Sequence, residues 1–334
     1  MSKINGRAYC FYNSQPPPGL SAGHIAAVDI SNPTTPRKLW DVVVNPAGVD
    51  RGDVSHDGSK LFVPTFEYNR TQAYNLVLRA SDGARIGTIP VPIQSHNTFV
   101  SLDGSLVWME NKKDGVINID SDPYDLSRID GRLRAASTAT NKVVYTAPRF
   151  LDQGPYKGSK ESGTPQPFVS TSDNQRIYSC VKGTYGFQWF YKSSNTVYAH
   201  NFTDQPYKGD RNYVTLHGLA LKPDETEVWV ADGSDNVVHV VDVTNPQRPV
   251  DKIRPGGGAR VVLNARRSHW ITFSLNGQYA YIAGPKRGGQ NAGVFNTETY
   301  SQVDSIAPTE VMVEVDYGIN GITAVGNQFG LGRK

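Results

Sequence analysis

One short phrase recurs along the chain and restricts the folds open to it: a strand, a turn that carries Asp or Asn, and a second apolar strand. Successive turn residues lie about 50 residues apart, except for one interval of about 70. Repeats of this period that are built from strands are typical of β-propeller blades. The copies are Val49–Val63, Ser95–Met109, Pro165–Ser179, Leu216–Val230, Ser268–Ile282 and Ile319–Asn327, and their turn residues are Asp57, Asp103, Asp173, Asp224, Asn276 and Asn327.

A third apolar strand follows each complete phrase, and a fourth follows several of them, which predicts four strands per unit. After Ser95–Met109 we expect the third strand at Gly115–Asp120 and the fourth at Lys142–Ala147, with Ser121–Ala136 as an insertion that contains a short helix. Composition agrees with an all-β chain, because β-branched and aromatic residues are abundant and 32 Gly and 21 Pro punctuate the turns.

The two ends of the chain carry complementary parts of one unit. The last phrase lacks its outer strands, whereas residues 7–45 contain strands with no phrase before them. We therefore expect one blade from residues 7–45 plus 319–328, because such closure would remove free sheet edges. The other blades begin near residues 49, 95, 165, 216 and 268. The prediction is a single six-bladed β-propeller domain over residues 1–334, in preference to seven blades.

Charge and hydropathy exclude several classes of protein. The net charge of +3, without a block of like charges, gives no indication of nucleic-acid binding. No apolar run is long enough for a signal peptide or a membrane-spanning helix, which predicts a cytoplasmic protein without membrane association, although an exported protein whose signal had been cleaved would share this pattern. Cys10 and Cys180 fall in different predicted blades, so we expect both thiols to be reduced. We also expect the protein to be a monomer or a weak oligomer.

The position seven residues before the turn is polar in every copy. Only seven histidines occur in the chain, yet three of them stand at this position. The first strand of a blade lines the central channel, so we expect these histidines to meet at its mouth and to bind one transition metal ion, Zn²⁺, Fe²⁺, Mn²⁺ or Cu²⁺. The alternative for each is a structural hydrogen bond to nearby backbone. The six residues are Asn320, Asp50, His96, Gln166, His217 and His269.

Three carboxylates are candidates for acid–base chemistry at this mouth. Asp50 belongs to the polar column itself, and it could be a ligand, a general base or merely a turn cap. Glu67 and Glu110 follow the second strands of their phrases, where a place on the surface is the competing interpretation.

The loops that share the mouth are basic and aromatic. The basic residues predict a small anionic substrate, and the aromatic residues indicate that this substrate can also be aromatic and bind by stacking. The alternative for the basic residues is a solvated rim, and the alternative for the aromatic residues is core packing between blades. Together with the polar Gln166 and Asn320, the residues expected to contact substrate are Arg51, Arg70, Lys182, Arg267, Tyr68, Trp189 and Trp270.

The segment Leu216–Asp242, LHGLALKPDETEVWVADGSDNVVHVVD, resembles a blade of the YVTN and lactonase-type propeller repeats. The resemblance implies a propeller and, through members with lactonase activity, a hydrolase, but no catalytic motif of the family is present. The leading hypothesis from the residues is a metal-dependent enzyme, a hydrolase, lyase or oxygenase. The alternatives are a metal-free scaffold that binds a peptide or partner protein, and a metal-free lactonase-like hydrolase.

Overall fold

Every regular element that the structure describes is a β-strand. The computed structural model describes residues 2–4, 7–14, 23–44, 49, 51–65, 73–91, 95–111, 131–153, 163–202, 216–233, 236–252, 260–262, 268–284, 291–309 and 311–328. Within these ranges no helix is long and apolar enough to cross a membrane. The chain divides into two compact units, Met1–Arg149 with Val315–Val325 and Phe150–Glu314 with Gly326–Lys334.

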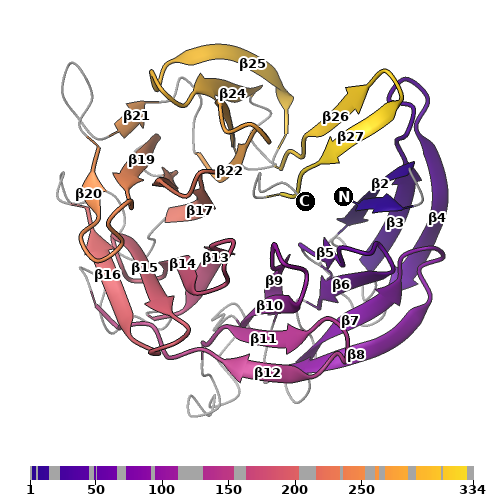
Figure 1. Ribbon diagram of the computed structural model, residues 1–334, viewed down its shortest axis with the longest axis horizontal. Coiled ribbons are helices and arrows are strands. Elements are labelled where there is room, and N and C mark those ends of the chain that lie inside the picture. The colour runs from indigo at the N-terminus through magenta and orange to yellow at the C-terminus, as the bar shows by residue number, and fades with distance from the viewer. Residues whose placement is uncertain are drawn as a thin grey trace, which may run out of the picture. The chain divides into compact units, whose positions relative to one another are not determined.

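The first unit contains three four-stranded antiparallel sheets and one hairpin among its described residues. In each four-stranded sheet the strands lie in chain order, as Figure 1 shows for β5 to β8. The sheets are β1 (Ser2–Ile4), β2 (Arg7–Ser14), β3 (Gly23–Asp29) and β4 (Arg37–Val44); β5 (Asp53–Val54), β6 (Lys60–Pro64), β7 (Ala73–Arg79) and β8 (Arg85–Val91); β9 (Ser95–Val100), β10 (Leu106–Asn111), β11 (Arg134–Ser137) and β12 (Val143–Thr146); the hairpin is β26 (Val315–Gly318) and β27 (Gly321–Val325).

The second unit repeats this pattern in three further sheets, one of which has a fifth strand that pairs beside β19. They comprise β13 (Pro165–Ser170), β14 (Arg176–Val181), β15 (Gly186–Tyr191) and β16 (Val197–Asn201); β17 (Leu216–Leu221), β18 (Glu227–Asp232), β19 (Val237–Asp242), β20 (Val250–Asp251) and β21 (Arg260–Val262); and β22 (Trp270–Phe273), β23 (Tyr279–Ala283), β24 (Asn291–Asn296) and β25 (Gln302–Pro308).

In five of the six copies the turn residue of the repeat fixes the first hairpin through its side chain. In the β9–β10 turn the Ser101 hydroxyl donates to Asp103 Oδ1 at 2.6 Å, and the Ser105 backbone N–H donates to the same oxygen at 3.0 Å. Gly104 then takes a φ of +72°, which a residue without Cβ adopts at little cost. Related contacts surround Asp57, Asp173, Asp224 and Asn276.

The predicted joining of the two chain ends in one sheet is not confirmed. The expectation ignored Ser2–Ile4, which forms β1 and occupies the edge of β2, with Ser2 opposite Tyr9. Gly321–Val325 pairs instead with β26. The hairpin is tied to the N-terminal sheet by the Tyr317 hydroxyl, which donates to the Ile30 carbonyl at 2.6 Å.

The third strand of the β9–β12 sheet also differs from the expectation. The end of the predicted insertion, Ser121–Ala136, enters β11 (Arg134–Ser137), and Ala135 and Ala136 are fully buried there. Burial between β10 and β12 overrides the helix preference of alanine. The segment Gly115–Asp120, predicted to be this strand, lies outside the described residues.

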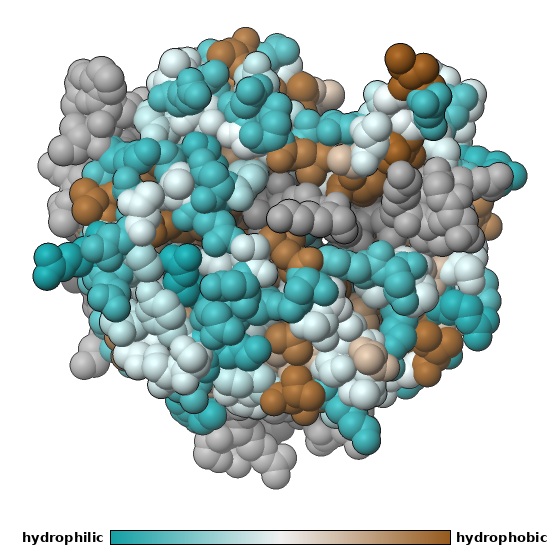
Figure 2. All heavy atoms as spheres, in the orientation of Figure 1, coloured by the Kyte–Doolittle hydropathy of each residue, from teal (hydrophilic) through white to brown (hydrophobic). Residues whose placement is uncertain are grey.

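Apolar side chains from neighbouring sheets form the core within each unit. In the first unit Phe62 and Val77 pack with Val100 and Val107 of the next sheet. In the second unit the core includes residues of β17–β19 and of β22–β24. On the face drawn in Figure 2 the described residues are mainly hydrophilic, and the hydrophobic ones form separate small patches. Such scattered exposure is ordinary for a folded domain.

Candidate functional site

The polar position of the repeat lies at a β-bulge. Between β9 and β10, Ser95 pairs with Asn111 and Thr98 pairs with Met109, so two residues, His96 and Asn97, face Glu110 alone. A bulge bends the strand and changes the direction of its side chains, and bulges are frequent beside active sites. The same irregularity occurs between β13 and β14, where it includes Gln166, and between β17 and β18, where it includes His217.

Only one of these three bulges has a carboxylate opposite it. The facing residue is Glu110 in the β9–β10 hairpin, Cys180 in β13–β14 and Ala231 in β17–β18. Glu110 is fully buried. Because a buried carboxylate is costly unless other groups compensate it, the side chains around Glu110 form the strongest candidate site that the structure describes.

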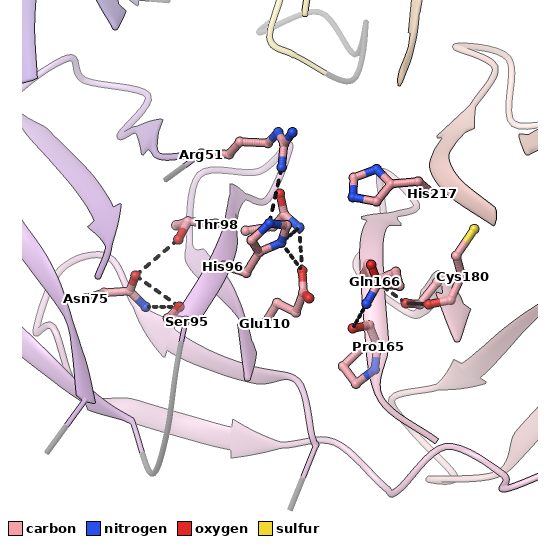
Figure 3. A network of polar contacts seen from close by, with 12 residues as sticks. Arg51, Asn75, Ser95, His96, Thr98, Glu110, Pro165, Gln166, Cys180 and His217 are labelled. Carbon is pink, nitrogen blue, oxygen red and sulfur yellow. Dashed lines mark hydrogen bonds and ion pairs between the residues drawn. The ribbon is translucent and has the colours of Figure 1, made fainter. Parts of the chain in front are cut away.

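A cluster of four side chains, which we call the bulge cluster, surrounds this carboxylate: Arg51, His96, Asn97 and Glu110. The Asn97 amide donates to Glu110 Oε2, and its nitrogen lies 2.8 Å from Nδ1 of His96. Nδ1 is 3.4 Å from Glu110 Oε2, and on the opposite side of the ring Nε2 is 3.4 Å from Arg51 Nη1. Figure 3 shows Arg51 and Glu110 on opposite sides of the His96 ring.

Three contacts bear on the tautomer of His96. The Asn97 amide nitrogen only donates, so its 2.8 Å contact favours Nδ1 as acceptor and the proton on Nε2, whereas the 3.4 Å contacts with Glu110 and Arg51 suit a proton on Nδ1. With the proton on Nε2, the ring and the Arg51 guanidinium present two donors whose nitrogens lie 3.4 Å apart. Donors at this separation suit a common acceptor oxygen. His96 is buried and Arg51 is half-buried, so the pair is positioned by the fold and still has access to solvent.

Backbone contacts with β9 hold Arg51 beside His96. The Thr98 N–H donates to the Arg51 carbonyl at 3.0 Å. Two residues later, the buried Asp53 accepts the Val100 N–H at 2.8 Å on one carboxylate oxygen and the Val54 N–H at 2.8 Å on the other. The segment that carries Arg51 is thus fixed along β9 rather than left as a free loop.

A second polar network supports the start of β9 (Figure 3). Asn75 of β7 donates to the Ser95 hydroxyl at 3.1 Å, and its carbonyl oxygen accepts the Thr98 hydroxyl at 3.2 Å. All three side chains are buried. Sequence reasoning missed Asn75, Asp53 and Asn97; the repeat register marked His96 but gave no sign that a bulge brings its neighbour to the same place.

The remaining predicted histidines form a separate environment in the second unit. The rings of His217 and His269 stack, with centroids 3.9 Å apart and planes at 17°, and His217 Nδ1 lies 3.3 Å from the His269 carbonyl oxygen. His96 belongs to the first unit. Within the described residues no group of three or more His, Cys, Asp or Glu side chains is arranged to hold a metal.

The other predicted substrate contacts have different surroundings. Trp189 and Trp270 are core residues; Trp189 stacks on Tyr198, and the Trp270 indole N–H donates to the Gln328 carbonyl at 2.8 Å. Gln166 is buried and donates to the Pro165 carbonyl. Lys182 is half-buried, and Asn320 is exposed in the β26–β27 turn. Asp50, Glu67, Tyr68, Arg70 and Arg267 lie outside the described residues.

Comparison with known sequences gives one short match. Residues 21–39 match a model of the LVIVD repeat, which is a repeat of β-propeller proteins. A search of curated proteins found no similar sequence.

Several solved structures have a similar fold at low sequence identity. The periplasmic gluconolactonase of Pseudomonas aeruginosa is 13% identical, with a TM-score of 0.64 over 90% of this chain and 83% of that one. A protein of Bacteroides fragilis, provisionally described as a 6-phosphogluconolactonase, is 12% identical, with a TM-score of 0.61 over 96% and 88%.

A propeller that is not described as a lactonase matches almost as well. The β-propeller domain of Cps50 from Myceliophteria thermophila is 12% identical, with a TM-score of 0.59 over 93% of this chain and 89% of that one. Because lactonases and other proteins share this architecture, the similarities support an assignment of the fold and not of the activity. The chain is an all-β protein with the fold type of β-propellers.

Proposed function

We propose that this protein is a lactonase-like hydrolase whose bulge cluster binds and polarises the carbonyl oxygen of a lactone. The observation that carries the proposal is the 3.4 Å separation of Arg51 Nη1 and His96 Nε2, which act as a pair of donors when the ring carries its proton on Nε2. The similarity to a gluconolactonase and to a 6-phosphogluconolactonase-like propeller supports a cyclic ester as substrate. In this proposal each four-stranded sheet is one propeller blade, and β9 is the first strand of its blade.

The two donors would act on the charge that develops during hydrolysis. Water adds to the lactone carbonyl carbon and loses one proton to solvent, and the carbonyl oxygen becomes an alkoxide, which the Arg51 guanidinium and the Nε2–H of His96 stabilise. The tetrahedral intermediate then collapses, the ring C–O bond breaks, and the leaving ring oxygen takes a proton from solvent, which gives the hydroxy acid. Glu110 lies on the other side of the ring, where its carboxylate accepts the Asn97 amide that contacts His96.

Asn97 has the role of a positioning residue. It contacts both His96 and Glu110, and it directs the donor nitrogen of the imidazole toward Arg51. The burial of Glu110 removes the ring from water on that side, which strengthens the electrostatic contribution of the cluster.

The test is hydrolysis of glucono-δ-lactone and of its 6-phosphate, followed by acid release at constant pH with and without EDTA. We expect catalysis above the spontaneous rate, equal in both conditions, and a fall of about 100-fold in kcat/KM for Arg51→Gln, the size typical of losing one donor to an oxyanion. Lys192→Gln removes another half-buried cation, one with no part in the proposed site, and serves as the matched control. Activity that disappears with EDTA and returns with a metal ion would contradict the proposal.

A further inference from the structure

The stacked histidines of the second unit are held together by a close approach of two strands. Gly218 directly follows His217 in the β17 bulge, and a Cβ atom at this position would lie 2.5 Å from the His269 carbonyl oxygen and 2.8 Å from the Trp270 Cα. Such distances are too short for any side chain other than hydrogen. Gly218 therefore lets β17 approach the chain leading into β22 closely enough for the two imidazoles to touch.

The contact with the His269 backbone assigns the tautomer of His217. His217 Nδ1 lies 3.3 Å from the His269 carbonyl oxygen, which can only accept, so Nδ1 carries the proton and Nε2 carries the lone pair. Two imidazolium rings would repel each other at a centroid separation of 3.9 Å, so neutral rings suit the stack. Neutral imidazole is the form that binds metal ions.

The two rings are close enough for one metal ion to reach both. Two metal–nitrogen bonds of about 2.0–2.1 Å span at most roughly 4 Å between the two nitrogens. The ring centroids are 3.9 Å apart, so rotation of a ring can bring one nitrogen of each within that span. Both side chains are half-buried, which positions them without excluding solvent. Because the planes are nearly parallel, at 17°, one ring must turn about its Cβ–Cγ bond to direct its lone pair at a shared ion.

We propose that His217 and His269 form a binding site for a divalent transition metal in the second unit, independent of the bulge cluster. Copper(II) is the best probe, because imidazole sites bind it more tightly than the other first-row divalent ions. The full chain is titrated with Cu²⁺ by calorimetry and by electron paramagnetic resonance. We expect one equivalent per chain, with nitrogen hyperfine structure from two imidazoles.

Variants identify the ligands. His217→Ala and His269→Ala should each weaken Cu²⁺ binding at least about 10-fold, whereas His24→Ala, which removes an exposed histidine of β3 in the first unit, should leave it unchanged. His96→Ala should also bind as the wild type does. A loss of binding in His96→Ala, or wild-type binding in both His217→Ala and His269→Ala, would overturn the assignment.

Gly218→Ala tests the close approach while keeping both imidazoles. In a folded variant, judged by near-ultraviolet circular dichroism, we expect weakened Cu²⁺ binding because the added methyl group separates the strands. Wild-type affinity in this variant would contradict the role given to Gly218. If the variant does not fold, His217→Gln and His269→Gln decide the question, since they preserve much of the side-chain volume and remove the ring nitrogens.

Discussion

The side-chain nitrogen of Asn97 lies 2.8 Å from Nδ1 of His96, and the same amide donates to the buried Glu110. The bulge between β9 and β10 makes this possible, because it sets two consecutive residues of β9 against one residue of β10. A single backbone irregularity thus brings an imidazole, an amide and a carboxylate into contact.

Replacement of Asn97 by alanine should lower stability and activity together. The variant leaves the fully buried Glu110 without its amide donor, which we expect to cost about 1–3 kcal/mol in the free energy of unfolding. His96 also loses the contact that favours the Nε2–H tautomer used in the proposal, so kcat should fall more than KM changes. Urea unfolding and steady-state kinetics check both effects, and a fall in stability with unchanged kcat and pH profile would show a purely structural role.

Asp53 should act on Arg51 through the backbone. Asp53→Ala removes the acceptor of two backbone N–H groups, those of Val54 and Val100, and hydrogen bonds to a charged group contribute about 1.5–3 kcal/mol each. We expect a loss of stability and a rise in KM, as the segment carrying Arg51 moves away from β9. Asp53→Asn keeps one acceptor oxygen and should lose less. An unaltered KM in a folded Asp53→Ala protein would contradict this positioning role.

The turn aspartates should make the fold sensitive to acid. The Ser55 hydroxyl, with the Ser59 backbone N–H, holds the pKa of Asp57 below its usual range in the folded protein. A carboxyl with a lowered folded pKa contributes stability above its unfolded pKa of about 3.9, and this contribution is lost as the pH falls through the folded value. Denaturant unfolding between pH 7 and pH 3 should show the decline.

Asp57→Asn is the matched test of this titration, because Asn276 occupies the equivalent turn and accepts the Ser274 hydroxyl at 2.7 Å. The variant should be as well folded as the wild type near neutral pH and should lose less stability on acidification. A pH dependence identical to that of the wild type would assign the acid sensitivity to other groups.

Cys180 should be inert in the native protein. Burial, with the nearby Asp232, raises the pKa of its thiol well above the usual range, so little thiolate forms near neutral pH. Iodoacetamide at pH 8 should leave Cys180 unmodified until the chain is unfolded, as peptide mapping by mass spectrometry would show. Rapid native modification of Cys180 would mean that β14 opens readily.

The repeat predicted most of the local fold because its turn chemistry is local. Asp103 and its counterparts accept bonds from residues two positions away, so the sequence alone gives the hairpin register. The same register led to His96, Gln166 and His217, which lie at corresponding bulges.

Long-range pairing was harder to predict. The sequence of Ser2–Ile4 does not predict that this segment, rather than Gly321–Val325, will pair with the edge of β2. Both candidate strands are short and similar in composition. The roles of Asn97 and Asp53 also escaped prediction, since they depend on a bulge and on backbone contacts between sheets that no spacing rule reveals. Trp270 looked like a substrate contact because an indole can stack on a ligand or pack in a core, and only its burial separates the two.

The most direct test of the account is the kcat/KM of His96→Ala for glucono-δ-lactone, measured beside His24→Ala. His96 supplies one of the two donors proposed to hold the carbonyl oxygen, whereas His24 is an exposed histidine on β3. The account predicts a fall of about 100-fold for His96→Ala with both proteins folded, and wild-type activity for His24→Ala. Equal activity of the two variants, or hydrolysis by the wild type at only the spontaneous rate, would contradict it.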